Sequence, residues 1–169
     1  MVGPAISIRK AAQSDLDTIW LLWKSIMEQK IYFPYDDTYS RADISKVWIN
    51  LSNPVYVAER AGEMVGAYIL RPNQPGYGKH IVNAAYMVNG NHRGAGIGGY
   101  LCAHSVKTAK ALGFRGMQFN LVVSTNQAAI RVWLANGFQI IGTVPGGFYH
   151  AELDRYVDAH IFFKDLIEN

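Results

Sequence analysis

The most informative stretch of this sequence is Arg93-Gly94-Ala95-Gly96-Ile97-Gly98-Gly99. It follows an apolar run at 80–88 that predicts a central strand, and it opens a helix that we expect at 96–112, ended by Gly113. Glycines at such a junction let the backbone approach a ligand closely, and the start of the helix adds free N–H groups and a positive dipole end. The stretch therefore predicts a cradle for phosphate groups.

Two well-known phosphate-binding loops do not fit this stretch. Gly94, Gly96 and Gly99 match the G-x-G-x-x-G spacing, but a Rossmann unit needs an acidic residue about 20 positions further on, and none occurs before Glu152. The stretch also follows a predicted hairpin, whereas a Rossmann loop follows the first strand of a βαβ unit. A Walker loop would require a Gly-Lys-Ser/Thr sequence, which does not follow here. The pattern therefore favours a pyrophosphate site without acidic recognition of a ribose.

Composition bounds the class of protein. The 169 residues (18.8 kDa) predict one domain over 1–169, and a hydrophobic content of 50% with 17% charged residues excludes a disordered chain. No apolar run approaches the roughly 18 residues that cross a bilayer, and residues 1–10 lack the apolar core of a secretory signal. The single cysteine, Cys102, can form neither an internal disulfide nor a Cys-rich zinc site. These features predict a cytoplasmic protein without a membrane partner.

Charge is distributed unevenly along the chain. Residues 64–151 contain no Asp or Glu, although they contain seven basic residues: Arg71, Lys79, Arg93, Lys107, Lys110, Arg115 and Arg131. A stretch without carboxylates suits an anionic ligand, and a buried sheet would exclude acids as well, so both explanations stay open. The basic residues are scattered and not interleaved with aromatic residues, which argues against a nucleic-acid partner.

Hydrophobic periodicity predicts an α/β (α+β) fold with one mixed central sheet. Helices begin at two capping pairs, Ser14 with Asp17 and Ser40 with Asp43, and Pro145-Gly146-Gly147 is expected to break the chain after the sixth strand. The expected strands lie at 6–10, 55–59, 64–70, 80–88, 117–123, 139–144 and 157–164, and the expected helices at 14–27, 40–51, 96–112 and 126–136. This order places about four helices on the faces of about seven strands.

Two motifs resemble the GCN5-related N-acetyltransferase (GNAT) superfamily. Residues 93–98 match its R-x-x-G-x-G/A loop, with Val88 five positions before it. Residues 126–138, NQAAIRVWLANGF, are similar to its N-x-x-A-x-x-x-Y-x-x-x-G-F segment. Because the element order agrees along nearly the whole chain, the resemblance implies a single N-acetyltransferase domain.

The resemblance implies acetyl-CoA as cosubstrate and no metal. The backbone of 93–99 would hold the pyrophosphate, and Met87 and Val88 would pair with the pantetheine as with an added strand. The family's tyrosine, which often protonates the departing thiolate, aligns with Trp133, whose indole is too weak an acid for that role, so we expect packing there. The implied cofactor-binding residues are Met87, Val88, Arg93, Gly94, Ala95, Gly96, Ile97, Gly98, Gly99, Asn126 and Trp133.

The acceptor pocket implied by the resemblance is aromatic and rich in amides. We predict that Asn120 and Asn126 are the catalytic residues that orient the acceptor amine or a bound water beside the thioester. The alternative is that they only satisfy backbone groups, since Asn126 is a good N-cap. The predicted substrate-binding residues are Asn83, Tyr32, Tyr35 and Tyr149. The segment 29–37 forms either a pocket wall or a packed loop. His150, Tyr149 and Glu28 are the other candidate proton acceptors.

The predicted function is direct transfer of the acetyl group to the amine of a small molecule. Asn83, Phe119-Asn120, Asn126 and Tyr156-Val157-Asp158-Ala159 look like those of yeast-type acetyltransferases of proline analogues, which implies an amino acid or a cyclic imino acid. The alternatives are a protein or peptide N-acetyltransferase and a non-catalytic acyl-CoA sensor on the same fold. The expected partner is therefore a small-molecule amine, and a homodimer is left open.

Overall fold

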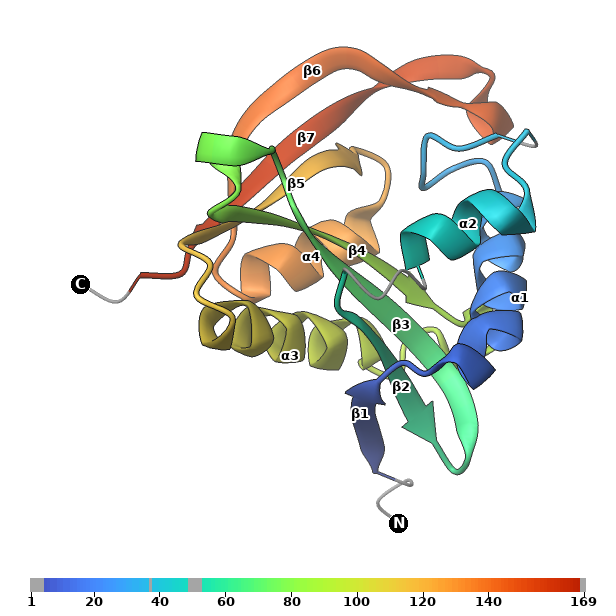
Figure 1. Cartoon of the computed structure of the whole chain (residues 1–169). Helices are drawn as coiled ribbons and strands as arrows, with labels where there is room; N and C mark the ends of the chain where they lie inside the picture. The colour runs from blue at the N-terminus through green and yellow to red at the C-terminus, as the bar shows by residue number, and fades with distance from the viewer. Residues whose placement is uncertain (1–4, 37, 49–52, 168–169) are drawn as a thin grey trace.

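A seven-stranded mixed sheet forms the centre of the molecule, in the order β1-β2-β3-β4-β5-β7-β6 (Figure 1). The computed structural model describes residues 5–36, 38–48 and 53–167. The strands are β1 (Ile6–Lys10), β2 (Val55–Arg60), β3 (Glu63–Pro72), β4 (Ile81–Val88), β5 (Gly116–Val123), β6 (Gln139–His150) and β7 (Arg155–Asp165). The helices are α1 (Leu16–Met27), α2 (Arg41–Trp48), α3 (Ile97–Ala111) and α4 (Gln127–Ala135). The predicted mixed sheet of seven strands with four helices is confirmed.

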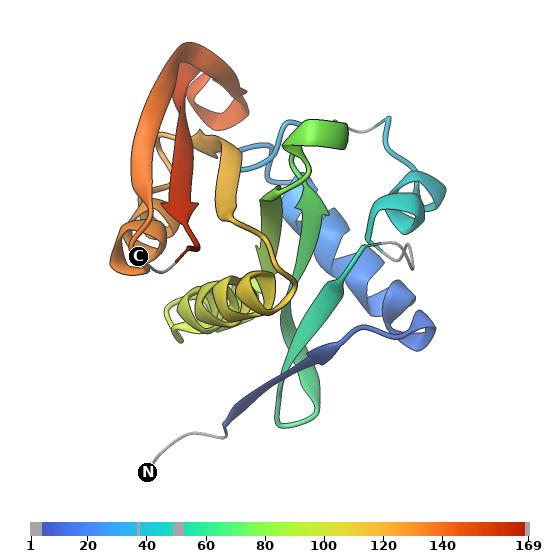
Figure 2. The same ribbon diagram turned by 60° about the vertical axis from the view of Figure 1, so that its left-hand side comes forward.

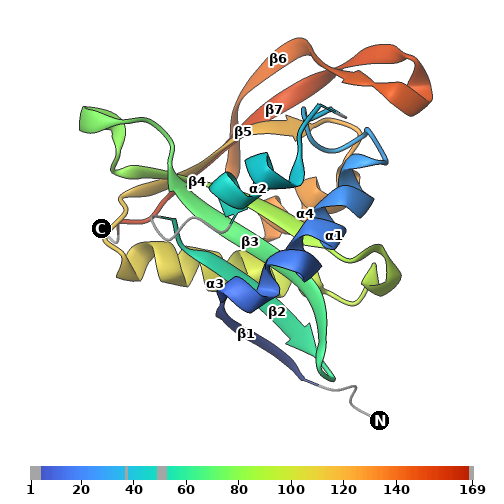
Figure 3. The ribbon, with the colours of Figure 1, turned by 45° about the vertical axis from the view of Figure 1, so that its right-hand side comes forward.

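The helices cover both faces of the sheet, α1 and α2 on one and α3 and α4 on the other (Figures 2 and 3). Alternation along β3 supplies both cores, because successive side chains of a strand point to opposite faces. Tyr68 and Leu70 pack toward α3, whereas Ala67 and Ile69 pack toward α1 and α2. Gly66 lets α3 approach closely, since a Cβ there would lie 3.0 Å from Leu101 Cδ1 and 3.4 Å from Ile97 Cγ2, both on α3.

The sheet divides between β4 and β5. These two strands are parallel and pair at only three positions, the last being Asn83 with Gln118. Beyond this point β5 follows β7, and a bulge after Phe119 shifts its register. Figure 2 shows β5, β7 and β6 turning away from the rest of the sheet. The edge of β4 that faces β5 is therefore left unpaired from Ala84 onward.

The first helix starts differently from the prediction, whereas the second start is as expected. Residues Gln13–Asp15 form a 3-10 turn, in which Asp15 Oδ2 accepts from the Ala12 N–H at 2.7 Å. The helix α1 begins only at Leu16, with Asp15 and not Ser14 as its N-cap. At α2 the Ser40 N–H donates to Asp43 Oδ2 at 3.0 Å, which confirms the predicted pair. The predicted extension of this helix to Leu51 lies outside the described residues.

The break predicted at Pro145-Gly146-Gly147 is wrong, because β6 continues through it to His150. The extra residues form a bulge opposite β7, between the pairs Val144–Ala159 and Phe148–Val157. Gly146 adopts φ +60°, and its N–H donates to Asp158 Oδ1 at 3.0 Å. Proline and glycine are compatible with a strand at such a bulge, where the ladder is interrupted anyway.

Candidate active site

The glycine-rich stretch forms the exposed N-terminal end of α3. Gly96 is the N-cap, with φ +75°, a conformation that favours glycine. The first hydrogen bond of the helix runs from the Tyr100 N–H to the Gly96 carbonyl at 3.2 Å. The N–H groups of the first turn, Ile97 to Gly99, therefore have no acceptor within the helix. This end of α3 has the geometry of an anion site.

The Arg93 side chain connects this loop to the segment that follows α1. Its Nη2 donates to Gln29 Oε1 at 2.6 Å, and its guanidinium lies over the Tyr32 ring, 5.7 Å from the ring centroid. Tyr32, predicted to bind the acceptor, is thus packed under Arg93 and lines neither cavity described below. The Glu63 carboxylate comes to 3.2 Å from His92 Nε2, just before the loop.

The unpaired edge of β4 leads from this loop toward the middle of the sheet. The Met87 side chain is 1% exposed and packs toward α1, while Val88 packs toward α3. These side chains therefore point above and below the sheet, and only backbone N–H and C=O groups line the edge. Such an edge accepts an extended chain that carries amide groups.

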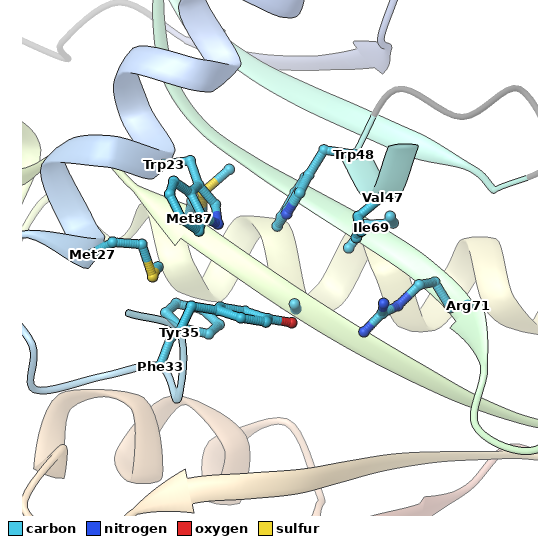
Figure 4. Close-up of a pocket in the computed structure, with 10 residues that line it drawn as sticks. Trp23, Met27, Phe33, Tyr35, Val47, Trp48, Ile69, Arg71 and Met87 are labelled. Atoms are coloured by element: carbon cyan, nitrogen blue, oxygen red, sulfur yellow. The ribbon is translucent and has the colours of Figure 1, made fainter. Parts of the chain in front are cut away.

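An aromatic cavity lies between strands β3 and β4 of the sheet and the helices α1 and α2 (Figure 4). Its volume is about 10 Å³, room for about one water-sized group. Tyr35, predicted to bind the acceptor, lines this cavity, and its ring lies 4.9 Å from that of Tyr39. The lining residues are Trp23, Met27, Phe33, Tyr35, Val47, Trp48, Ile69, Arg71, Ala85 and Met87.

A second, more open cavity of about 260 Å³ brings Asn83 and Asn120 together. The Nδ2 of Asn83 donates to the Gln118 carbonyl at 3.0 Å, and that of Asn120 donates to Asn73 Oδ1 at 2.7 Å. Gln118 Nε2 donates to Asn120 Oδ1 at 3.0 Å. In the described parts of the chain Asn83 Oδ1 has no partner, so it is available to a ligand.

Arg71 lines both cavities, and sequence reasoning did not identify it as a site residue. It lies near the end of β3 and pairs across the strands with Asn83. Its side chain is half-buried and has no hydrogen bond or ion pair to any residue that the structure describes. A basic residue that ends an apolar strand, Ala67 to Leu70, was the only sequence signal for it.

The two predicted site residues on α4 have structural contacts. Asn126 is the N-cap, and its Oδ1 accepts from the Ala129 N–H at 3.2 Å. Trp133 is 8% exposed, with its ring 4.8 Å from the rings of both Tyr86 and Phe119. Burial raises the pKa of Tyr86 well above its usual value, and its hydroxyl lies 2.7 Å from Ser105 Oγ. Asn126 therefore caps α4, and Trp133 belongs to the core on the α3 side.

The three other candidate proton acceptors line neither cavity. Tyr149 is half-exposed near the tip of the β6–β7 hairpin, and its hydroxyl donates to Asp154, a contact that raises the pKa of this tyrosine. His150 is buried, and its Nδ1 accepts from the Leu153 N–H at 3.3 Å. Glu28 lies on the surface, 3.8 Å from Lys24.

Membrane-spanning helices and metal-binding clusters are both absent from the described ranges 5–36, 38–48 and 53–167. No helix there is long and apolar enough to cross a bilayer. No group of three or more His, Cys, Asp or Glu side chains there is arranged to hold a metal ion.

A model of the acetyltransferase (GNAT) family matches residues 17–138. The chain belongs to this family. The match spans α1 to α4 and includes the glycine loop, the divided strands and both cavities. It confirms the family that the two sequence motifs indicated.

Solved GNAT structures share the fold over nearly the whole chain. A GCN5-related N-acetyltransferase from Kribbella flavida has a TM-score of 0.91 and 33% identity, and the match covers 95% of this chain and 98% of that one. YncA from Salmonella typhimurium, solved with acetyl-CoA, has a TM-score of 0.86 and covers 98% and 96%; at 22% identity it shows the fold alone.

Two curated yeast proteins are similar over part of their length. N-acetyltransferase aca1 of Schizosaccharomyces pombe is 35% identical over 99 residues, which is 59% of this chain and 47% of the relative. Protein SPT10 of Saccharomyces cerevisiae is 31% identical over 104 residues, 62% of this chain and 16% of the relative. The matched region thus spans about half or less of each relative.

Proposed function

We propose that this GNAT domain transfers the acetyl group of acetyl-CoA to the amine of a small molecule, an amino acid or a cyclic imino acid. The observation that carries the proposal is the unpaired edge of β4. It runs from the free N–H groups at the start of α3 to Asn83, where the amide-lined cavity begins. The backbone amides of β4 thereby connect the anion site at the start of α3 with the cavity proposed for the polar acceptor.

The residues along this path suit acetyl-CoA. The N–H groups of Ile97, Gly98 and Gly99 are oriented to bind the pyrophosphate, and the backbone of Ala84–Val88 offers donors and acceptors to the pantetheine amides. When bound, acetyl-CoA supplies an activated thioester acyl group. None of the described residues that line the two cavities carries a carboxylate that would repel its phosphates.

The amides of the second cavity suit a neutral amine. Asn83 Oδ1 is free to accept a hydrogen bond from the amine. Asn120, which is held by hydrogen bonds with Asn73 and Gln118, forms the opposite side of the same cavity. An amide is a poor base, so the proton of the attacking amine leaves to water in this open cavity. Trp133, packed in the core, takes no part in proton transfer.

The size and lining of the cavities favour a small acceptor over a basic peptide. The aromatic cavity admits a group of about one water's size, and the cavity beside it offers amides and a guanidinium. Lysine-rich peptide substrates would gain nothing from Arg71, whose charge repels them. Relatives named as N-acetyltransferases are consistent with catalysis.

An amine panel tests the proposal. The chain is incubated with acetyl-CoA and free amino acids, cyclic imino acids, simple amines or basic peptides, and release of CoA thiol and acetylated product is measured. We expect acetyl-CoA to bind and amino or imino acids to be acetylated. Acetylation of peptides alone would contradict the proposal, and binding without turnover of any amine would identify an acyl-CoA sensor.

Substitutions test the predicted amide residues. Asn120→Ala should lower kcat/KM about tenfold or more while acetyl-CoA affinity stays within about twofold, because the residue lines the proposed acceptor cavity and lies away from the start of α3. Asn126→Ala should cost about 1 kcal/mol of stability through the lost cap, whereas Asn126→Ser keeps a capping oxygen. If Asn126 has a catalytic role, both variants lose activity; full activity of Asn126→Ser would leave Asn126 only its cap.

A further inference from the structure

We propose that Arg71 binds a carboxylate of the acceptor, which makes the acceptor an α-amino or α-imino acid and Arg71 the residue that selects for it. This inference rests on the proposed acetyl transfer and narrows its substrate class. It assigns to Arg71 the recognition of the acid group, and to Asn83 the recognition of the neighbouring amine.

The Arg71 guanidinium has no hydrogen bond or ion pair to any residue within 5–36, 38–48 and 53–167. Arg9 pairs with Asp15 and Glu59, and Arg41 with Asp17. Surface arginines of this chain such as Arg115 also lack partners in the described residues, but water solvates them. Arg71 is half-buried between two cavities, where an unpaired charge is costly. A bound anion would remove this cost.

The position of Arg71 beside Asn83 also fits an amino acid. Arg71 and Asn83 are directly opposite on β3 and β4, and Asn83 is the last position at which β4 pairs with β5. Their Cβ atoms are therefore about 5 Å apart, as in any cross-strand pair. In an α-amino acid a single carbon separates the amine from the carboxylate, so one molecule can contact both side chains. The amine would then lie where the unpaired edge of β4 begins.

The surroundings of the guanidinium suit an anion. Among the described residues, none that lines either cavity carries a carboxylate that would compete for Arg71. Figure 4 shows the Tyr35 hydroxyl and the Arg71 guanidinium directed toward one another across the aromatic cavity. In the larger cavity, which Arg71 also lines, a carboxylate would receive two N–H bonds from the planar guanidinium.

The proposal predicts a preference for the acid over its neutral analogues. Hydrogen bonds to a charged partner are worth about a 10- to 100-fold change in affinity. The wild-type chain should therefore acetylate its best amino acid with a kcat/KM at least about tenfold above that of the corresponding amide or decarboxylated amine.

The test uses Arg71→Gln and Arg71→Lys, with Arg115→Gln as a matched control at an exposed arginine outside both cavities. Arg71→Gln should lower kcat/KM for the acid by about 10- to 100-fold and leave the amide unchanged, so that the preference disappears. Arg71→Lys should restore part of it, because lysine keeps the charge but not the planar fork. Calorimetric binding of the amino acid to the chain saturated with CoA gives a readout independent of turnover.

The outcomes separate this inference from the proposed function. If the wild type acetylates acids, amides and simple amines equally, or if Arg71→Gln keeps the preference, the inference is wrong and acetyl transfer to small amines stands. If Arg71 variants instead lose acetyl-CoA affinity, Arg71 serves the cosubstrate and the inference is overturned. If the wild type acetylates no amine, the proposed function itself fails. Thermal unfolding checks that each variant folds. If Arg71→Gln does not fold, Arg71→Lys alone tests whether the preference for the acid depends on the guanidinium.

Discussion

At the scale of single residues, the glycines at the start of α3 have different roles. Gly96 needs its positive φ to cap the helix, so any substitution there strains the backbone. Gly99 has an ordinary φ, and a Cβ built on it would meet no atom within 4 Å. Gly99 is therefore the position at which a charge can be placed beside the phosphate site without disturbing the fold.

We expect Gly99→Asp to fold and to bind CoA at least about tenfold more weakly than the wild type. The carboxylate lies in the first turn of α3, where it stabilises the helix but competes with phosphate for the free N–H groups. Gly99→Ala is the control and should bind normally. Calorimetry gives the affinity and thermal unfolding the stability; wild-type affinity of the Asp variant would move the pyrophosphate site elsewhere.

His104 makes stability depend on pH. Its Nδ1 lies 2.7 Å from the Tyr68 hydroxyl, and burial, followed by the charge of Lys107, lowers the pKa of this histidine below its usual value near 6.5. Above that value both folded and unfolded states hold a neutral imidazole. Below it the unfolded state takes up a proton more readily, so the free energy of unfolding falls until the folded-state pKa is reached.

We therefore expect the wild type to lose more stability between about pH 7.5 and 5.5 than His104→Gln does, since the variant lacks this titration. Urea unfolding at the two pH values measures the difference. Exposed His80 supplies the control variant, His80→Gln, which should follow the wild type. Equal losses in the wild type and His104→Gln would exclude His104 as the cause.

At the scale of elements, α4 is held to the divided sheet by a cluster of rings. Trp133 contacts Tyr86 of β4 and Phe119 of β5, so it bridges the two strands near the point where they separate. Phe119 also stacks on Phe138, with ring centroids 4.6 Å apart. The cluster supports the division of the sheet from the face opposite the two cavities.

Trp133→Phe should keep kcat within about threefold, because the ring packs and donates no proton to the reaction. The smaller ring should cost roughly 1–2 kcal/mol of stability. Steady-state kinetics and urea unfolding measure the two effects. A fall in kcat of about a hundredfold, the scale of a lost general acid, would show that the indole N–H takes part.

At the scale of the whole molecule, one long segment of the chain contains no acidic residue. Residues 64–151 supply β4, the glycine loop, α3 and β5, so nearly all of the proposed acetyl-CoA site is free of carboxylates. Both faces of the sheet are packed against helices, and the proposed ligands reach the site along the division between β4 and β5. A homodimer remains a prediction.

The affinity for acetyl-CoA should fall several-fold as salt is raised from about 50 to 500 mM, because the Debye length shortens and phosphate binding is screened. S-acetylpantetheine, which lacks the phosphates, is the matched control and should show little salt dependence. Competition calorimetry measures both. Equal salt dependence of the two ligands would contradict an electrostatic contribution at the start of α3.

The sequence alone was sufficient for most of the elements, for the family and for the glycine-rich start of α3. Hydrophobic periodicity, helix caps and glycine spacing act over a few residues. The motifs at 93–99 and 126–138 can therefore be identified without tertiary context. Where a local sequence signal competed with strand pairing, the prediction made from that signal was wrong. Pro145 and its two glycines suggested a break, but the ladder between β6 and β7 absorbs them as a bulge.

Only the tertiary structure brings the acceptor cavities together. Arg71 and Asn83 are twelve positions apart in the chain, and the register between β3 and β4 makes them neighbours, while Asn73 and Asn120 meet from opposite sides of the divided sheet. The same folding carries Tyr149 to the hairpin tip and packs Tyr32 under Arg93. Strand register depends on the pairing of whole hydrophobic faces, which no short stretch of sequence encodes.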